Sequence, residues 1–252
     1  MQNTQLDPTI ETVSAEEAPD CKVFSPDAQN ASPSSLRRYL INKRIFDIVF
    51  SLSVLILLSP VYLILALLIV LDDPHAGPIY AQTRVGKDGK PFRFYKFRTM
   101  VKDADRMLDS LLDLNEKRGG PAFKIKDDPR ITRVGRFLRK TSLDELPQFF
   151  NVLKGEMSVV GPRPELPFFV DMYKDVVPLY MVKHQVKPGL TGWAQVNGYR
   201  GDTSIEKRIE YDIWYIENWS MYLDLKIIFM TVFGGMVNEE KNLFKEKQEQ
   251  KV

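Results

Sequence analysis

IFDIVFSLSVLILLSPVYLILALLIVL, residues 45–71, is the most apolar stretch of the 252-residue chain. As a straight helix it would be roughly 40 Å long at about 1.5 Å per residue, longer than the hydrocarbon core of a bilayer at about 30 Å. Few globular cores can bury a helix of this length, since most helices in such proteins are only three or four turns long. The stretch therefore predicts contact with a membrane.

Ser59 and Pro60 interrupt this stretch near its middle. Proline lacks an amide donor and clashes with the preceding turn, so a bend is expected here. The two arms, residues 45–58 and 60–71, would be roughly 21 Å and 18 Å long as helices, each too short to cross a bilayer alone. A helix-break-helix hairpin that enters and leaves by one face fits this pattern, and hydropathy alone does not separate it from a kinked span.

The charges that flank the stretch differ in sign. Arg37, Arg38, Lys43 and Arg44 precede it, and Asp72 and Asp73 follow it. The positive-inside rule places the basic side in the cytoplasm. A simple span would then export the rest of the chain, whereas a re-entrant hairpin would keep it on the same side.

Outside this stretch the composition is that of a globular protein. With 35 basic and 33 acidic residues the net charge is +2, which gives no general case for binding nucleic acid. Residues 1–35 are acidic and polar without an apolar period, so they predict a flexible arm, and residues 245–252 form a polar tail. The single cysteine, Cys21, excludes an internal disulfide and any multi-cysteine metal site. The predicted division is an arm (1–35), a membrane hairpin (36–72), one globular domain (73–244) and the tail.

The globular part begins with a β-hairpin. Ile79–Val85 and Pro91–Phe97 are rich in strand-forming residues and flank a five-residue loop. Val101–Asn115 has the spacing of a helix. Basic residues then cluster, and they are Lys124, Lys126, Arg130, Arg133, Arg136, Arg139 and Lys140. The last three would share one helix face, which on the simplest interpretation is a solvated surface.

A helix start follows the basic cluster. Ser142 and Glu145 have the S-x-x-E spacing of a capping box and predict a helix that runs to about Leu153. On spacing alone, capping is the simpler role for Glu145. The same helix end favours an ionised Asp144 and, with the nearby arginines, would attract a phosphate. Asp144 is therefore a candidate nucleophile towards phosphorus or a magnesium ligand.

Arg163 stands between Pro162 and Pro164. Two prolines fix the backbone on both sides, so the planar guanidinium would be aimed with little loss of entropy, and a phosphate is its natural partner. Lys96 and Arg98, at the end of the second predicted strand, are either strand-edge charges or further phosphate contacts. His75 and His184 are far apart in sequence, show no metal-ligand pattern, and have no predicted role.

These motifs occur together in a fixed order. They are Lys43–Asp47, Ser59-Pro60, YKFRTM (95–100), SLDELPQ (142–148), GPRP (161–164) and KPGLTG (187–192). The ordered set closely resembles the bacterial sugar transferase family, the monotopic phosphoglycosyl transferases that begin exopolysaccharide and O-antigen assembly. The resemblance runs from about Lys43 to Phe244.

The resemblance implies a reaction: a sugar-1-phosphate passes from a UDP-sugar to undecaprenyl phosphate, and UMP is released. Asp144 and Glu145 match the family's catalytic dyad. Asp144 would be the nucleophile, forming an aspartyl phospho-sugar, and would bind Mg²⁺ together with the diphosphate. The residues that match the family's phosphate-binding positions are Arg163 with Pro162 and Pro164, and the basic residues Lys96, Arg98 and Arg139.

The resemblance also implies a fold and a location. Family members place the Ser-Pro break in a re-entrant helix at the cytoplasmic face of the bacterial inner membrane, so residues 73–244 are expected to form a cytoplasmic catalytic domain. The expected class is α/β, mostly helical with a small β-hairpin or sheet and with amphipathic interfacial helices. Trp219–Val237 is either a core helix or one of these interfacial helices.

The identity of the sugar remains open at this stage. Residues 187–201 look most like the glucose-transferring branch, with galactose or an N-acetylated amino sugar as alternatives, because selectivity for one hydroxyl can depend on few residues. A non-catalytic scaffold of a polysaccharide assembly complex is the main alternative to an enzyme. A nucleic-acid binder would leave the apolar stretch unexplained. Nothing indicates an oligomeric state, and a homo-oligomer remains open.

Overall fold

The computed structural model describes residues 33–107, 125, 128–201 and 203–234. Most of the predicted arm, Cys21, the polar tail, Lys124 and Lys126 lie outside the described residues. The described part is mostly helical and contains two small two-stranded sheets, which fits the expected α/β class. The second sheet was not predicted.

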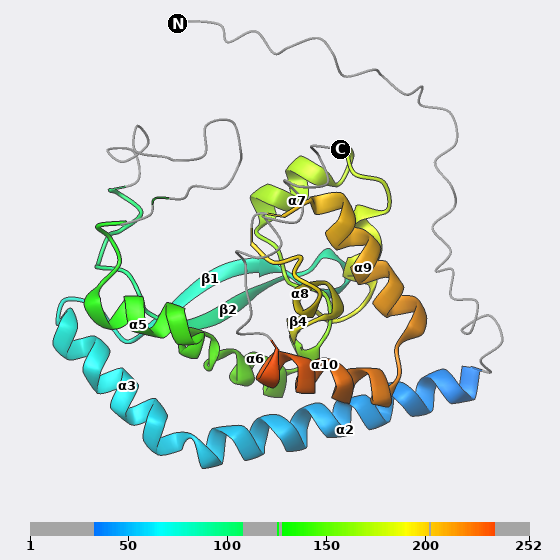
Figure 1. Ribbon diagram of the computed structural model, residues 1–252, viewed down its shortest axis with the longest axis horizontal. Coiled ribbons are helices and arrows are strands. Elements are labelled where there is room, and N and C mark those ends of the chain that lie inside the picture. Colours follow the sequence, from blue (N-terminus) through cyan, green and yellow to red (C-terminus); the bar gives the residue numbers. More distant parts are fainter. Residues whose placement is uncertain (1–32, 108–124, 126–127, 202, 235–252) are drawn as a thin grey trace, which may run out of the picture.

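Two long helices, α2 (Pro33–Leu57) and α3 (Ser59–Asp72), run along the base of the molecule (Figure 1). Among the described residues no single helix is long and apolar enough to cross a bilayer; α2 from Arg37 and α3 meet that test as a pair, and they are bent by 62°. Pro60 has no amide for the carbonyl of Ile56, and the Ser59 hydroxyl donates to that carbonyl instead, at 2.8 Å. The break therefore falls at the Ser-Pro pair, as predicted.

α2 turns its polar side chains towards the protein. Lys43, Asp47 and Ser51 lie one turn apart and are 8%, 2% and 0% exposed. The Asp47 carboxylate accepts hydrogen bonds from the Ser158 hydroxyl and the Val159 amide, both at 3.0 Å. The outward face is mainly apolar, and its exposed side chains include Ile45, Val49, Leu52, Ile56 and Leu57. A helix in water normally has the reverse arrangement, with its apolar stripe facing the core.

The two sheets lie above this base. β1 (Ile79–Val85) and β2 (Pro91–Phe97) pair antiparallel with Val85 opposite Pro91, so the predicted hairpin and its five-residue loop are confirmed. β3 (Ser158–Val160) and β4 (Gly189–Thr191) pair in parallel. A Cβ atom on Gly189 would lie 2.1 Å from the Gly161 amide nitrogen, so this pairing requires glycine.

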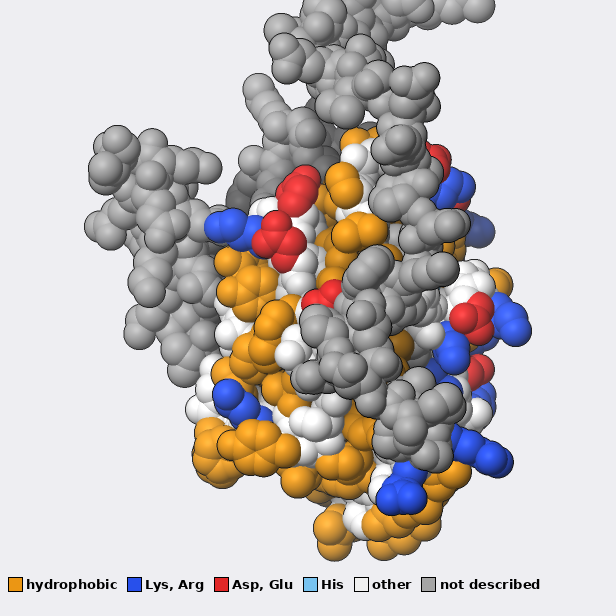
Figure 2. Space-filling model, turned by 90° about the vertical axis from the view of Figure 1, so that its right-hand side faces the viewer, with side chains coloured by type: hydrophobic (Ala, Val, Ile, Leu, Met, Phe, Trp, Pro, Cys, Tyr) orange, Lys and Arg blue, Asp and Glu red, His pale blue; other side chains and the backbone are white. Residues whose placement is uncertain are grey.

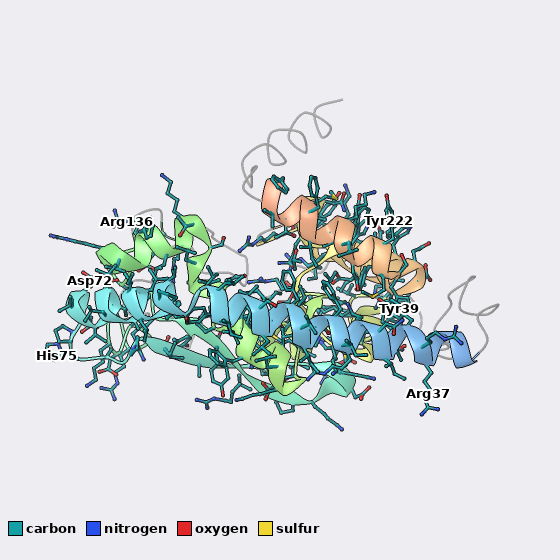
Figure 3. All side chains as sticks on the ribbon, turned by 90° about the horizontal axis from the view of Figure 1, so that it is seen from below. Arg37, Tyr39, Asp72, His75, Arg136 and Tyr222 are labelled. Atoms are coloured by element: carbon teal, nitrogen blue, oxygen red, sulfur yellow. The ribbon has the colours of Figure 1, made fainter. Side chains whose placement is uncertain are left out.

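Shorter helices surround the sheets. They are α5 (Arg133–Thr141), α6 (Gln148–Lys154), α7 (Pro167–Tyr173), α8 (Trp193–Val196), α9 (Ile205–Asn218) and α10 (Met221–Phe233). Among the described residues, 3-10 turns cover Lys87–Gly89, Leu143–Glu145 and Tyr180–Gln185. Seen from below, α5 lies beside α3 and α10 beside α2, on the same side of the bent pair (Figure 3).

The core joins the bent pair to the rest of the molecule. The main cluster contains Phe94, Val152, Met157, Val160, Tyr215 and Ile227, and Phe46 and Phe50 of α2 pack against it. A second cluster holds Leu65 and Ile69 of α3 against Phe97 and Leu138. α2 and α3 are therefore parts of the folded unit.

α10 has two apolar faces. Leu223 and Ile227 are buried, while Tyr222, Phe229 and Phe233 on the other side are 79%, 61% and 71% exposed. This helix occupies most of the predicted Trp219–Val237 segment, and it has both a core face and an apolar outer face. Figure 2 shows hydrophobic side chains gathered at the lower end of the molecule, with lysine and arginine at the edges of that region.

Two local predictions are wrong. Residues 101–107, expected to begin the helix to Asn115, form turns, and the Lys102 amide donates a hydrogen bond to the Asp73 carboxylate at 2.9 Å. Residues 108–115 of that segment lie outside the described residues. The side chain of Ser142 does not cap the start of a helix: Ser142 is the left-handed C-cap of α5, with a φ of 55°, and its side chain makes no cap hydrogen bond to the 3-10 turn that follows. α6 begins only at Gln148, after that turn.

Candidate functional site

Asp144 and Glu145 lie in the 3-10 turn between α5 and α6. Asp144 is only 8% exposed. The Lys96 ammonium, from β2, lies 3.5 Å from Oδ2 of Asp144 and 3.3 Å from Oε1 of Glu145. One cation therefore contacts both carboxylates of the predicted dyad.

Glu145 also faces two arginines. Oε1 of Glu145 lies 3.8 Å from a guanidinium nitrogen of Arg163 and 3.4 Å from one of Arg200. Arg163 belongs to the loop after β3, and Arg200 to the turn before α9. Three cations thus surround two neighbouring carboxylates, leaving excess positive charge that an anionic substrate can neutralise.

The two carboxylates differ in their acidity. Burial alone would raise the pKa of Glu145, but Arg163, Lys96 and Arg200 together outweigh it and lower the pKa to about 2. Burial raises the pKa of Asp144, Lys96 opposes that rise, and the neighbouring Glu145 charge adds to it. Glu145 is therefore the fixed counter-ion of the cations, and Asp144 is the more basic of the pair.

Asn151 fixes β2 against α6. Its side-chain amide donates to the Arg93 carbonyl at 2.6 Å and accepts from the Tyr95 amide at 3.1 Å. These bonds flank the strand residues that lead to Lys96. Asn151 is fully buried, so Lys96 is set at a defined position relative to the turn that carries the carboxylates.

α5 approaches the end of β2 at a glycine. A Cβ atom on Gly135 would lie 2.1 Å from the Thr99 carbonyl oxygen, so only glycine allows this contact. The Thr99 hydroxyl in turn accepts from Nε of Arg139 at 2.9 Å. Arg139 lies near enough to Asp144 to lower the pKa of that carboxyl, though less than Lys96 does.

The bent pair α2–α3 holds the segment that follows the carboxylates. The Tyr62 hydroxyl of α3 donates to the Leu146 carbonyl, directly after Glu145. Arg44 of α2 donates to the carbonyls of Val152 and Leu153 at 2.6 and 2.8 Å, at the end of α6. Both helices therefore determine where the carboxylates lie relative to the apolar base.

The predicted residues do not all meet in one place. Asp144, Glu145, Lys96 and Arg163 come together, with Pro162 and Pro164 on either side of Arg163, and Arg139 lies at the edge of the group. Arg98 instead donates to the Gly77 carbonyl at 2.8 Å. Its guanidinium also lies over the Tyr80 ring, 5.9 Å from the centroid, so it serves the base of the hairpin.

Arg200 is a site residue that the sequence analysis missed. It lies 55 positions after Glu145, and it was quoted only as part of the 187–201 segment. Its proximity to Gly201, which has a φ of 69°, marks a tight turn. In the sequence, the only sign of a role for Arg200 was its position beside a glycine. Its approach to Glu145 depends on the fold.

The donor set fits a magnesium ion shared with a substrate. Within the described ranges no group of three or more histidine, cysteine, aspartate or glutamate side chains is placed to hold a metal by itself. Mg²⁺ is commonly bound by one or two carboxylates together with substrate phosphates and water. Here the Asp144 carboxylate, with that of Glu145 beside it, could bind the ion together with the phosphates of a substrate.

The chain is similar to known proteins over most of its length. The profile of the family described as bacterial sugar transferase matches residues 38–238. A UDP-glucose:undecaprenyl-phosphate glucose-1-phosphate transferase of Escherichia coli is 48% identical over 203 residues, covering 78% of this chain and 40% of that protein. An undecaprenyl-phosphate galactose phosphotransferase of Salmonella typhimurium is 46% identical over 207 residues, covering 81% of this chain and 42% of the relative.

Other relatives have a similar length to this chain. An exopolysaccharide production protein of Rhizobium leguminosarum is 46% identical over 205 residues, which cover 78% of this chain and 96% of that protein. The chain thus spans about two fifths of the longer relatives and nearly the whole of this shorter one.

Proposed function

The chain belongs to the bacterial sugar transferase family, and we propose that it transfers a sugar-1-phosphate from a UDP-sugar to undecaprenyl phosphate, with release of UMP. The observation that carries this proposal is the contrast between the two acidic residues of the turn. Glu145 is engaged by Lys96, Arg163 and Arg200, while Asp144 contacts Lys96 at 3.5 Å.

Asp144 is the proposed nucleophile because it is the more basic carboxylate of the pair. Burial raises its pKa, and a more basic carboxylate is a better nucleophile. One of its carboxylate oxygens attacks the phosphorus that bears the sugar. The bond from that phosphorus to the bridging oxygen breaks, UMP leaves with the electron pair, and an aspartyl phospho-sugar remains.

The second half of the reaction restores the carboxylate. A phosphate oxygen of undecaprenyl phosphate attacks the same phosphorus, and the bond to the Asp144 oxygen breaks. The products are undecaprenyl-diphospho-sugar and an ionised Asp144. Lys96, Arg163 and Arg200 balance the charge of the phosphates through both halves.

Asp144 is the proposed Mg²⁺ ligand, with Glu145 beside it. When bound, the ion would neutralise the negative charge that otherwise repels a carboxylate from a diphosphate. Within the chain, Lys96 and Arg163 supply part of the same neutralisation.

We further propose that the protein lies at the cytoplasmic face of the bacterial inner membrane. The polarity of α2 supports this, because Lys43, Asp47 and Ser51 are buried while the outward face is mainly apolar. The outer face of α3, with Leu63 and Leu71 exposed by 74% and 67%, and that of α10 extend the same apolar base. A 62° bend at Ser59-Pro60 suits entry and exit by one face.

Glucose is the proposed sugar. The E. coli relative named for glucose is 48% identical to this chain, and relatives named for galactose and N-acetylgalactosamine are 46% and 45% identical. The product would serve exopolysaccharide or O-antigen-type assembly, a role that the name of the Rhizobium relative supports.

The test is UMP release by purified protein in nanodiscs containing undecaprenyl phosphate, with a panel of UDP-sugars. We expect release with UDP-glucose and a loss of at least about 10³-fold in Asp144→Asn, since removing the nucleophile removes the chemical step. Asp171→Asn is the matched control, because its side chain is 71% exposed and pairs only with Lys174 among its described contacts. It should keep the native rate.

The outcomes separate the alternatives. Release with another UDP-sugar alone would change the proposed donor. No release with any donor, while cells still need the protein for polysaccharide, would favour a scaffold. Native rates in Asp144→Asn would remove Asp144 as the nucleophile.

A further inference from the structure

A cluster of buried charges lies behind the phosphate-binding cations. Glu165, Lys183 and Arg208 are 6%, 2% and 8% exposed. Oε1 of Glu165 lies 3.4 Å from the Lys183 ammonium and 3.1 Å from a guanidinium nitrogen of Arg208. Burying three charges is costly unless they are well arranged, so their arrangement calls for a reason.

Arg208 contacts two loops at once. One guanidinium nitrogen donates to Glu165, two residues after Arg163. The other donates to the Gly201 carbonyl at 2.6 Å, directly after Arg200. Arg163 and Arg200 both face Glu145. Arg208 therefore joins the two loops that carry these two cations.

The two loops differ in their other support. The loop of Arg163 is also held from β1, because Arg84 donates to the Pro164 carbonyl at 3.1 Å and the Val85 amide donates to the Glu165 carbonyl at 2.9 Å. Before the Gly201 turn, the Tyr199 amide donates to the Ala194 carbonyl at 2.9 Å. At Gly201 itself, the carbonyl accepts its hydrogen bond from Arg208. Losing Arg208 should therefore disturb Arg200 more than Arg163.

From these contacts we infer that Arg208 is a positioning residue: its planar fork holds Arg200, and to a lesser degree Arg163, at the distance from Glu145 that phosphate binding requires. It does not touch the reacting atoms. A lysine cannot replace it, because a single ammonium lacks the fixed fork that reaches both a carboxylate and a carbonyl. This inference rests on the proposed function.

The test is a double-mutant cycle on the full chain in nanodiscs, with kcat/KM for UMP release as the readout. Arg208→Met should lower kcat/KM about 10²-fold, the size of a misplaced binding group. Arg200→Met should cost about tenfold in the native background and less than about twofold in the Arg208→Met background, because a displaced Arg200 has little left to lose. Arg208→Lys should lower kcat/KM as much as Arg208→Met does. If Arg208→Met does not fold, the cycle is repeated with Arg208→Lys.

Lys183→Met is the matched control. It removes an equally buried cation from the same Glu165 carboxylate but leaves the bond from Arg208 to Gly201 in place. Its effect should add to that of Arg200→Met. The inference would be overturned if Arg200→Met lowered kcat/KM by the same factor in the native and the Arg208-substituted backgrounds. It would also be overturned if Lys183→Met were coupled to Arg200→Met as strongly as Arg208→Met is.

Amide hydrogen exchange provides a readout that does not depend on activity. Segment 198–203 should exchange faster in Arg208→Met and Arg208→Lys than in Lys183→Met. Unchanged exchange would contradict the positioning role even if activity fell. If the native protein releases no UMP, the proposed function fails, and the exchange experiment still decides whether Arg208 holds this turn.

Discussion

Neighbouring carboxylates acquire different chemistry here because cations are distributed unevenly around them. Glu145 faces Lys96, Arg163 and Arg200, whereas Asp144 shares Lys96 alone at salt-bridge distance among the described residues. The pKa of Glu145 falls to about 2, and that of Asp144 rises above its usual range through burial. This difference supports the proposal that Glu145 has a structural role and that Asp144 carries the chemistry.

The pH dependence of kcat/KM should reveal this coupling. Activity falls on the acid side as Asp144 takes up a proton. The Glu145 charge raises the pKa of Asp144 and Lys96 lowers it, so Glu145→Gln should move the acid limb to lower pH and Lys96→Met to higher pH. Each shift should be about one pH unit.

The measured quantity is the pH at which kcat/KM falls on the acid side in each variant. It does not depend on how far each substitution lowers the maximal rate. Opposite shifts support Asp144 as the group that must be ionised. Shifts in the same direction, or an unchanged limb in both variants, would mean that another group controls the acid side.

At the scale of elements, the sequence predicted the hairpin and the helix break, but it did not predict where α6 begins or that Arg200 reaches Glu145. The β1–β2 hairpin and the Ser59-Pro60 break depend on residues that are adjacent in sequence, and both were predicted. The capping box failed because S-x-x-E spacing does not reveal that Ser142 adopts a φ of 55°. Arg200 was missed because only the fold brings it to Glu145 across 55 positions.

The break between α2 and α3 is stabilised by a local exchange of hydrogen bonds. Ser59 takes the Ile56 carbonyl that Pro60 cannot serve. Ser59→Ala should cost about 1 kcal/mol, because that carbonyl then loses its hydrogen-bond partner. Thermal unfolding in detergent measures this, and Ser53→Ala is the control serine of α2. Equal stability of Ser59→Ala and the native protein would show that the hydroxyl does not support the bend.

The bend should also determine topology. In a Cys21→Ser background, Arg37→Cys and Glu210→Cys place single thiols at exposed positions on either side of the hairpin in sequence. A membrane-impermeant maleimide should label both only after the inner membrane is opened. Labelling of one site in intact spheroplasts and not the other would mean a true span.

For the whole molecule, a buried ion pair joins α2 to α10. Lys43 of α2 and Asp224 of α10 pair at 2.7 Å, and Asp224 is fully buried. Asp224 also accepts the Tyr215 hydroxyl at 2.6 Å. Together with the bonds of Arg44 and Tyr62, this pair fixes the hairpin to the folded domain.

Breaking the pair should destabilise the protein strongly. Lys43→Met leaves the Asp224 charge buried without its cation, at a cost of about 3–5 kcal/mol. Adding Asp224→Asn should recover much of that loss, because the uncompensated charge is removed. Chemical unfolding of the native protein, both single variants and the double variant measures the coupling. A double variant as unstable as the two losses combined would show that the ions act independently.

The covalent step is the claim on which the remaining assignments depend, and mass spectrometry of the intact protein can observe it. The protein is mixed with UDP-glucose without lipid acceptor and quenched with acid. Native protein should gain the mass of one hexose phosphate, mapped to Asp144 and lost when undecaprenyl phosphate is added before quenching, and Asp144→Asn should gain none. Catalysis through Asp144 would be contradicted if the enzyme turned over fully and the quenched protein carried no hexose phosphate. An adduct on a different residue would contradict it as well.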